Sequence, residues 1–246
     1  MNAAPILAAS GLGKRFGGFV ALADIELTVA PGERLGLIGP NGSGKSTLVN
    51  CLCGTLRNET GTVTFAGQRI DGLAAHRRTR LGLARSFQLP KPFHTLNLID
   101  NLRVPLLYTV NARADHRLAA SDVEARCHEL LRQVSLGDKA RRLPSDLTQV
   151  EMRKLELARA VATRPRLLFA DEAMAGLSPS EIKEILAVLF RLNEAGITIV
   201  LIEHIMSAVM SFSTRLAVLV AGQKIADGPP PEVVRNPEVE RAYLGQ

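Results

Sequence analysis

A glycine-rich segment that ends in Lys-Ser-Thr is the part of this 246-residue chain whose residue types and spacing point most directly to chemistry. It fits the pattern G-x-x-x-x-G-K-[ST] in full and follows the apolar run 34–38. Its members are Gly39, Pro40, Asn41, Gly42, Ser43, Gly44, Lys45, Ser46 and Thr47. Glycines let backbone N–H groups approach an anion, Lys45 adds charge near the β and γ phosphates, and the Ser46 hydroxyl can bind Mg²⁺. The segment predicts a nucleoside triphosphate site.

A second set of candidate residues follows the apolar run 167–170, where Asp171 and Glu172 stand side by side. An acid at the carboxyl end of a buried strand can hold Mg²⁺, and a second acid just beyond it can polarise an attacking water. We assign Asp171 to the metal and Glu172 to the general base. A strand ending in Asp-Glu is common by chance, so this Walker B form gains its weight from the phosphate loop in the same chain.

Hydrophobic patterning indicates the strands that must hold these residues. Segments 20–29 and 61–70 alternate apolar and polar residues, as half-buried antiparallel strands do. Segments 35–38, 167–170 and 198–202 are continuous apolar runs, which suit a sheet covered on both faces. The sequence therefore predicts two kinds of sheet within one compact unit.

Helical periodicity replaces this pattern between residues 95 and 163. Apolar residues recur at intervals of three and four from Val123 to Val134, and again from Met152 to Ala162. Pro165 closes the second stripe. A shorter helix is expected directly after the phosphate loop, ending at Gly54.

Charge and aromatic content bear on the choice of partner. Thirty Lys and Arg against 24 Asp and Glu give a formal net charge of +6, which suits nucleic acid or an anionic membrane face. The basic clusters 77–80 and 139–142 are more often solvated faces than binding sites. With aromatic residues at 4% and no tryptophan, the chain offers no basic and aromatic platform for single strands. Nucleic acid is therefore disfavoured.

Neither the start of the chain nor its cysteines indicate a secreted or membrane-spanning protein. No basic and apolar leader opens the sequence, and no apolar run reaches the roughly 18 residues that a spanning helix needs. Cys51, Cys53 and Cys127 form neither a metal-binding spacing nor a disulfide framework, so we expect packing thiols. The expectation is a soluble, intracellular chain.

With the phosphate loop and the Walker B acids in this order, nearly the whole chain resembles the ATP-binding subunit of an ABC transporter. Phe16 stands where that family stacks an aromatic ring on adenine, and Gln88 where it has the Q-loop glutamine. His204 stands where it has the switch histidine that contacts the γ-phosphate. The resemblance implies that Gln88 and His204 join Glu172 as catalytic residues, with Gln88 also a ligand of Mg²⁺. It implies ATP hydrolysis, with ATP and Mg²⁺ as cofactors.

Three further segments resemble the ATPases of branched-chain amino acid importers, namely 175–179, 201–206 and 236–245. Importers of urea, short amides and aromatic acids share these features, so the resemblance defines the subfamily better than the cargo. It implies one of two unlike ATPase subunits beneath two membrane permeases, supplied by an external solute-binding protein. It also implies a peripheral position on the cytoplasmic face of the inner membrane, with no nucleic acid partner.

The ABC signature segment is where the sequence departs from the family. Aligned without gaps, the family's Leu-Ser-Gly-Gly-Gln corresponds to Leu147, Thr148, Gln149, Val150 and Glu151. In the family this segment opens a helix that meets the γ-phosphate held by the opposing subunit. Here Gln149 and Val150 put side chains where the backbone must approach, and valine resists unusual φ. Thr148 and Glu151 fit a capping box, with which the helix satisfies its own N–H groups, and Glu151 brings negative charge near an anion.

Two smaller departures follow the Walker B acids. Ala173 stands where the family usually has proline, and Ser178 where it has Asp or Asn. Ser178 is followed by Pro179 and Glu181, a combination typical of a helix start.

The predicted fold is α/β: a P-loop NTPase core of the ABC ATPase type, with an N-terminal antiparallel β layer and an inserted helical subdomain. We expect a single ABC ATPase domain over 1–246, with the nucleotide-binding core at 1–90 and 165–246 and the helical subdomain at 91–164. The expected function is ATP hydrolysis that powers import. Two alternatives stay open: a non-transport ABC ATPase acting on DNA or ribosomes, and a regulatory subunit that holds nucleotide with little turnover.

Overall fold

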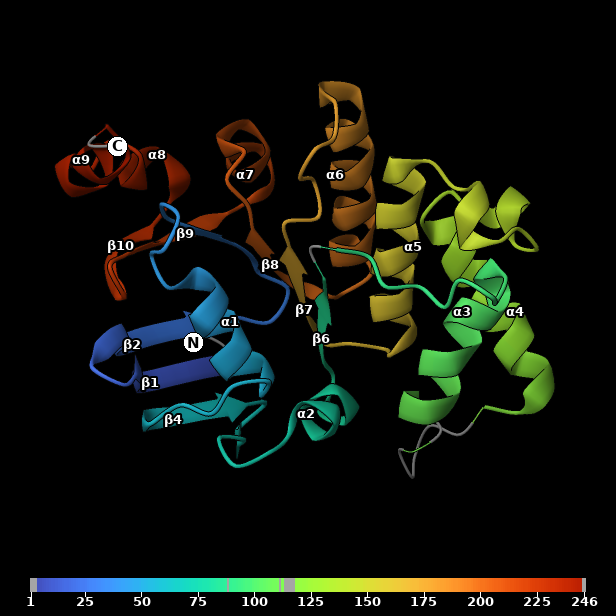
Figure 1. The fold of residues 1–246 in the computed structure, drawn as a ribbon, viewed down its shortest axis with the longest axis horizontal. Helices are drawn as coiled ribbons and strands as arrows, with labels where there is room; N and C mark the ends of the chain where they lie inside the picture. Colours follow the sequence, from blue (N-terminus) through green and yellow to red (C-terminus); the bar gives the residue numbers. More distant parts are fainter. Residues whose placement is uncertain (1–3, 88, 111, 113–117, 245–246) are drawn as a thin grey trace. The chain divides into compact units, whose positions relative to one another are not determined.

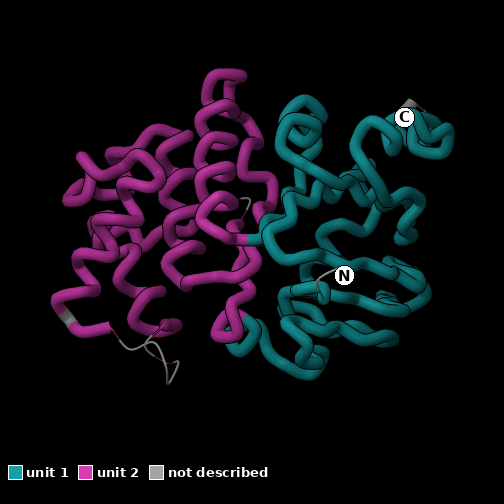
Figure 2. Tube along the Cα trace, turned by 180° about the vertical axis from the view of Figure 1, so that it is seen from behind, with its two compact units in different colours: residues 1–78, 198–246 teal, residues 79–197 magenta. Residues whose placement is uncertain are grey.

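The computed structural model of the chain describes residues 4–87, 89–110, 112 and 118–244. The main chain forms two compact units, one made of Met1–Arg78 with Thr198–Gln246 and the other of Thr79–Ile197 (Figure 2). The second unit is thus inserted in the sequence of the first, and the boundary near residue 78 falls within helix α2 (Ala75–Leu81). In the described part of the chain, every helix lacks the length and hydropathy needed to cross a membrane.

An antiparallel sheet forms the N-terminal layer of the first unit (Figure 1). Its strands, in the order β2-β1-β4-β5, are β1 (Leu7–Phe16), β2 (Phe19–Val29), β4 (Thr60–Phe65) and β5 (Gln68–Arg69). The predicted single strand at 61–70 is wrong in one respect, because Ala66 and Gly67 have φ of 50° and 80° and turn the chain into a hairpin. A two-residue turn with positive φ at both positions matches the twist of the flanking strands.

A second sheet of the first unit carries the phosphate loop. Strand β3 (Arg34–Ile38) pairs in parallel with β8 (Thr198–Ile202) and with β9 (Arg215–Val220), and β10 (Gln223–Gly228) runs antiparallel to β9. The apolar runs of β3 and β8 are buried almost throughout, as predicted for a sheet covered on both faces. The other helices of this unit are α1 (Lys45–Cys53), α7 (Met206–Phe212), α8 (Pro230–Val233) and α9 (Pro237–Leu244).

Arg78 corrects the expectation that cluster 77–80 is a solvated face. Its side chain is only 1% exposed, and its guanidinium donates to the carbonyl oxygens of Cys51 and Leu52 at 2.7 and 2.8 Å. It also bonds to two carbonyls of the chain just before α2. Because the last carbonyls of a helix lack intrahelical partners, this buried cation caps the carboxyl end of α1. The predicted end of α1 at Gly54, which has φ 78°, is confirmed.

The second unit combines two parallel strands with a group of helices. Strands β6 (Leu83–Ser86) and β7 (Leu167–Asp171) pair in parallel. Helices α3 (Leu98–Pro105), α4 (Ala120–Gln133) and α5 (Gln149–Ala162) pack together, and α6 (Pro179–Glu194) packs on α4 and α5 (Figure 1). The predicted apolar stripes fall on α4 and α5, where Cys127, Leu131, Leu155 and Leu157 are buried. The predicted α/β class is confirmed.

Cys51, Cys53 and Cys127 are reduced and buried, and their burial agrees with the expectation of packing thiols. Burial raises the pKa of Cys51 and of Cys127 to about 11. Both thiols are therefore protonated at neutral pH, and a protonated thiol is a poor nucleophile.

Candidate nucleotide site

The phosphate loop joins β3 to α1, and its glycines take the conformations that the sequence predicts. Gly39, Gly42 and Gly44 have φ of 151°, 75° and 102°, a region that disfavours side chains. Space is short as well: a Cβ on Gly39 would lie 2.1 Å from the Leu219 carbonyl oxygen, and one on Gly44 would lie 2.8 Å from that of Ala21. The loop therefore rests against β9 and β2 in a shape that requires glycine.

Helix α1 begins at this loop without a side-chain cap. Gly44 occupies the N-cap position in the left-handed conformation, and the first turn of α1 contains no acidic residue. The first N–H groups of a helix have no intrahelical acceptor, so they can bind an anion. Lys45 Nζ donates to the carbonyl oxygens of Gly39 and Pro40 at 2.7 and 2.9 Å, which keeps the ammonium at the loop, and Ser46 is exposed. The arrangement suits a phosphate group.

Phe16 and His204 are exposed residues of the first unit. The Phe16 side chain at the end of β1 is 49% exposed, and Lys14 Nζ lies 5.3 Å from its ring centroid, within cation–π range. The His204 side chain, just after β8, is 62% exposed, and its Nδ1 lies 4.0 Å from Oε2 of the buried Glu203. The exposure leaves each ring open to a ligand, as stacking on a base or contact with a phosphate requires.

The two Walker B acids lie in the second unit, in different environments. Asp171 is buried at the end of β7, and Arg85 on β6 binds one of its carboxylate oxygens through Nη2 at 2.5 Å and Nε at 3.1 Å. This pairing balances a charge that would be costly to bury alone. Glu172 is partly exposed and has φ 46°, a conformation that costs a non-glycine residue of the order of 1–3 kcal/mol. Such strain gathers at functional sites, and here it falls on the residue assigned as the general base.

Gln88, predicted as the Q-loop glutamine, lies outside the described residues. The residues before it are described: the Arg85 guanidinium lies 5.6 Å from the ring centroid of the exposed Phe87. One arginine thus contacts both Asp171 and the segment that leads to Gln88. Sequence reasoning missed Arg85, because 86 residues separate it from Asp171 and only the pairing of β6 with β7 brings the two together.

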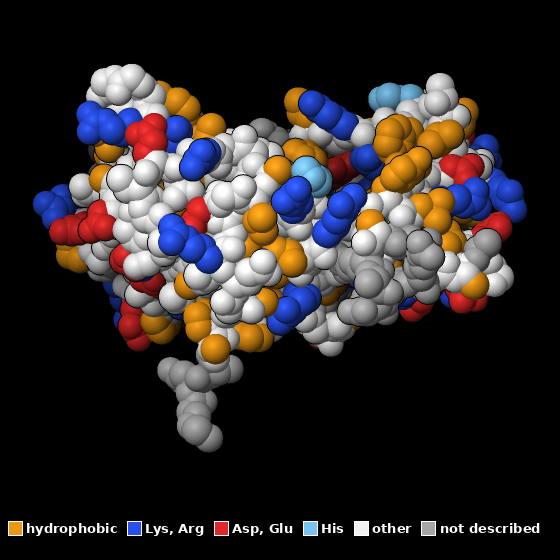
Figure 3. All heavy atoms as spheres, turned by 90° about the horizontal axis from the view of Figure 1, so that it is seen from below, with side chains coloured by type: hydrophobic (Ala, Val, Ile, Leu, Met, Phe, Trp, Pro, Cys, Tyr) orange, Lys and Arg blue, Asp and Glu red, His pale blue; other side chains and the backbone are white. Residues whose placement is uncertain are grey.

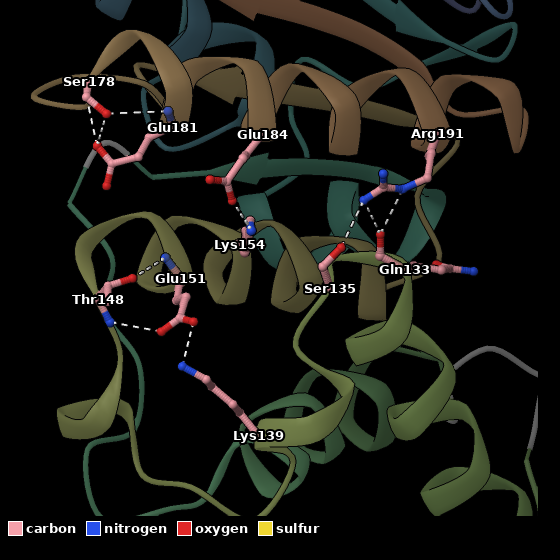
Figure 4. A network of polar contacts seen from close by, with 10 residues as sticks. All are labelled: Gln133, Ser135, Lys139, Thr148, Glu151, Lys154, Ser178, Glu181, Glu184 and Arg191. Atoms are coloured by element: carbon pink, nitrogen blue, oxygen red, sulfur yellow. Dashed lines mark hydrogen bonds and ion pairs between the residues drawn. The ribbon is translucent and has the colours of Figure 1, made fainter.

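The signature segment forms the start of α5 and is capped by its own side chains, as predicted (Figure 4). Thr148 Oγ1 accepts the N–H of Glu151 at 3.4 Å, and Glu151 Oε2 accepts the N–H of Thr148 at 3.0 Å. Gln149 and Val150 belong to the helix, and neither has a positive φ. Val150 is only 7% exposed, so of the two residues at the glycine positions only Gln149 presents its side chain at the surface, and the expected obstruction is limited to Gln149.

The loop after the Walker B acids lies beside this helix start. Ser178 and Glu181 form the predicted capping box at the start of α6, with the N–H of Ser178 donating to Glu181 Oε2 at 2.8 Å. Gly176 has φ 77°, and a Cβ on it would come within 3.0 Å of Gln149 Nε2. Within the second unit, the amide end of the Gln149 side chain therefore lies close to the loop at Gly176.

The family model described as ABC transporter matches residues 22–175, more than half of the chain. The chain belongs to the ABC transporter family. A second model, described as branched-chain amino acid ATP-binding cassette transporter, matches residues 223–246 of this ABC protein. ABC transporter ATP-binding proteins are ATPases, so the predicted enzyme class is confirmed.

Two relatives and one solved structure show how far the likeness of this ABC ATPase extends. It is 38% identical over 251 residues to the high-affinity branched-chain amino acid transport ATP-binding protein LivG of Escherichia coli K12, with 98% of each chain covered. It is 38% identical over 232 residues to the methionine import ATP-binding protein MetN of Rhizobium johnstonii, covering 92% of this chain and 62% of that one. The crystal structure of the ADP conformation of MJ1267, an ATP-binding cassette of an ABC transporter, matches with a TM-score of 0.88 and 29% identity, over 99% and 100% of the two chains.

The donor groups of this ABC ATPase fit ATP with Mg²⁺. The uncapped start of α1 and the glycine loop provide N–H groups for phosphate oxygens. The Ser46 hydroxyl of the first unit and, taken separately, the Asp171 carboxylate of the second unit are hard oxygen groups of the type that Mg²⁺ prefers.

Proposed function

We propose that this ABC ATPase powers the import of branched-chain amino acids or of a related small solute. The observation that carries the proposal is the match with LivG over 98% of both chains, which includes the C-terminal segment 223–246 matched by a branched-chain amino acid family model. MetN reaches the same identity over less of this chain. Identity alone therefore does not separate the cargoes, whereas coverage and the C-terminal segment favour the branched-chain group.

In the proposed reaction, residues of the first unit bind and orient the nucleotide. The backbone of loop 39–47 cradles the phosphates, and Lys45 places its charge on the β and γ phosphates. Phe16 stacks on the adenine, which its exposure at the end of β1 permits. His204, exposed after β8, contacts the γ-phosphate.

The Walker B acids and their neighbours supply the metal ligands and the general base in the proposed reaction. Asp171, Gln88 and Ser46 would hold Mg²⁺, and Arg85 orients the Asp171 carboxylate from the neighbouring strand. Glu172 accepts a proton from the attacking water, a role for which its partial exposure is required.

The proposed assembly contains a second, unlike ATPase subunit, two membrane permeases and an external solute-binding protein. The chain would sit on the cytoplasmic face of the inner membrane, with a nucleotide-binding core at 1–90 and 165–246 and a helical subdomain at 91–164 that meets the permeases. Exposed apolar side chains in the second unit support such a contact; they include Phe87, Leu89, Phe93, Leu107 and Tyr108.

A regulatory subunit with little turnover is the second candidate function, favoured by the self-capped start of α5. Importers of urea, short amides or aromatic acids remain alternatives for the cargo. A non-transport ATPase acting on nucleic acid is the weaker alternative, because aromatic residues make up only 4% of the chain and tryptophan is absent; Figure 3 shows hydrophobic side chains next to Lys and Arg side chains on one face.

Purification and reconstitution test the proposal. The chain is isolated with its co-purifying subunits, placed in proteoliposomes that contain Mg-ATP, and offered labelled leucine, urea or benzoate with the cognate binding protein. We expect permeases to co-purify, leucine uptake to require ATP, and the binding protein with leucine to stimulate phosphate release. Uptake of urea or benzoate instead would change the cargo. Co-purifying nucleic acid or ribosomes without permeases would overturn the transport function.

A further inference from the structure

Lys139 connects the 3₁₀ turn η2 (Gly137–Lys139) to the start of α5 (Figure 4). Its Nζ lies 2.6 Å from Glu151 Oε1, while the other carboxylate oxygen of Glu151 accepts the N–H of Thr148. The sequence suggested that cluster 139–142 is a solvated face. This expectation is corrected for Lys139, because its charge pairs with a residue of the signature segment.

Glu151 carries its negative charge inside the first turn of α5. Partial burial acts to raise the pKa of Glu151, but the hydrogen bonds from Lys139 and Thr148 outweigh burial and hold the pKa below its ordinary value. The carboxylate is therefore ionised at neutral pH. Like charges brought together at an interface repel strongly, so a bare Glu151 would oppose a phosphate that reaches this helix start.

We propose that Lys139 is a positioning residue of the composite ATP site: it neutralises Glu151 and holds the carboxylate in the capping box, so that the start of α5 can receive a phosphate. The inference rests on the proposed function, because this phosphate is the γ-phosphate of ATP bound to the opposing subunit. Lys139 acts through Glu151 and touches no substrate itself.

The backbone at this helix start provides donors for such a phosphate. The first intrahelical bond runs from the N–H of Met152 to the carbonyl oxygen of Thr148, and the capping box uses the N–H groups of Thr148 and Glu151. The N–H groups of Gln149 and Val150 belong to the first turn, where a helix has no acceptor of its own. These two positions align with the glycines of the family signature, so the loss of glycine keeps both donors and adds an exposed side chain only at Gln149.

Other contacts anchor α5 in the second unit. Lys154 Nζ lies 2.6 Å from Glu184 Oε2 and ties α5 to α6 (Figure 4), and the apolar stripe of α5 is buried. We therefore expect the loss of Lys139 to change the charge at the start of α5 more than the fold of the unit.

The test measures ATP-dependent pairing of the full-length chain in a Glu172→Gln background, in which slow hydrolysis allows ATP-bound pairs to accumulate. Sedimentation velocity with Mg-ATP gives the dissociation constant of the self-pair. Lys139→Ala is expected to weaken pairing about tenfold, because both composite sites of a self-pair contain this signature segment. Adding Glu151→Gln is expected to restore pairing, because it removes the charge that Lys139 balances. Lys139→Met keeps much of the aliphatic stem and separates lost charge from lost packing.

Lys224→Ala is the matched control. Lys224 Nζ also lies 2.6 Å from a carboxylate oxygen, that of Asp227, but on β10 of the first unit. The Lys224→Ala variant should pair with the same dissociation constant as the parent. Titration with a fluorescent ATP analogue, at protein concentrations low enough to keep the chain monomeric, measures nucleotide affinity independently of pairing. If Lys139→Ala pairs like the parent, or if Glu151→Gln fails to restore pairing, the inference alone is wrong. A parent that does not bind the analogue, or never pairs with itself or with the cognate ATPase, overturns the proposed function and the inference together.

Discussion

Two helix starts, one in each unit, are assigned to phosphate, and they are built in opposite ways. Helix α1 begins at a left-handed Gly44 with no side-chain cap, whereas α5 begins at Thr148 with a complete capping box and Glu151 in its first turn. No side-chain cap occupies the first N–H groups of α1, whereas the capping box satisfies part of those of α5. An uncapped helix start makes the free protein less stable, because its N–H groups lack side-chain acceptors. A capped start binds an anion less tightly, because some of its N–H groups are already bonded.

Glu172→Gln should have the largest effect. It tests whether the second unit supplies the general base as well as the phosphate-binding start of α5. Hydrolysis by the assembly should fall by about 10²–10⁴-fold, while ATP binding to the chain is retained, because the change removes only the proton acceptor. Phosphate release is measured with the partner's own site disabled. Glu194→Gln on the exposed end of α6 is the control. Unchanged turnover would show that another residue is the general base.

Lys45→Ala tests how far the uncapped start of α1 depends on its charged loop. Removal of the ammonium should cost about 1.5–3 kcal/mol of binding free energy, because a charge-assisted contact with the phosphates is lost. Titration with a fluorescent ATP analogue measures the change, and Lys183→Ala on the exposed face of α6 is the control. An unchanged affinity would contradict the assignment of the phosphate loop.

Restoring glycine in α5 makes its start more like that of α1. Gln149→Gly should raise ATP turnover of the isolated chain about fivefold, the equivalent of one neutral hydrogen bond, because the exposed side chain no longer blocks the backbone. Val150→Gly should instead lower the free energy of unfolding by about 2–3 kcal/mol, since the Val150 side chain is buried.

Steady-state phosphate release at saturating Mg-ATP compares the chain alone, its Gln149→Gly variant and the full assembly. The unmodified chain alone should be much slower than the assembly, because a self-pair contains two altered signatures. Equal rates for the two would refute the idea that this signature is impaired.

Thr148→Ala removes the cap that distinguishes α5 from α1. The free energy of unfolding should fall by about 1 kcal/mol, because one N–H group of the first turn loses its acceptor. Urea unfolding at neutral pH measures the loss. Nucleotide affinity of the isolated chain should not change, and Ser145→Ala in the preceding turn provides a hydroxyl-removal control. A fall in affinity equal to the fall in stability would mean that the cap supports the chain's own nucleotide site.

The smallest expected effect is the pH dependence at Glu151. Folding lowers the pKa of Glu151 from its ordinary value of 4.5, so the ionised form contributes stability that is present above this pH and lost as the pH falls below it. Glu151→Gln should therefore be less stable than the parent at pH 7, and the difference should shrink as the solution is acidified. Urea midpoints across this range test the sign, and a difference that grows in acid would contradict it.

The sequence predicted those features that depend on neighbours in the chain. The left-handed glycines of the phosphate loop, the end of α1 at Gly54 and both capping boxes follow from local residue patterns. The buried strands β3, β7 and β8 follow from continuous apolar runs. Local backbone preference and burial agree at these places, which is why the pattern sufficed.

The sequence did not predict the charges that are paired across long separations. Arg78 and Lys139 lie in basic stretches and Arg85 lies in a mostly apolar stretch, and each binds a group that only tertiary folding brings near. A basic cluster in a sequence does not show which of its side chains is buried or paired. That depends on where the fold places the carboxyl end of a helix or a carboxylate that can bind a cation. Burial of Val150 was missed because it depends on how α5 packs in the second unit, which the residues of the segment do not show.

The positions of the three buried thiols provide reporters of local opening. Cys51 and Cys53 belong to the first unit and Cys127 to the second, and burial protects all three in the native chain. The rate at which an alkylating reagent modifies each thiol therefore measures how often its unit opens, and mass spectrometry can follow both units in one sample. A cysteine placed at the exposed Ser178 would carry a spectroscopic label without removal of the native thiols.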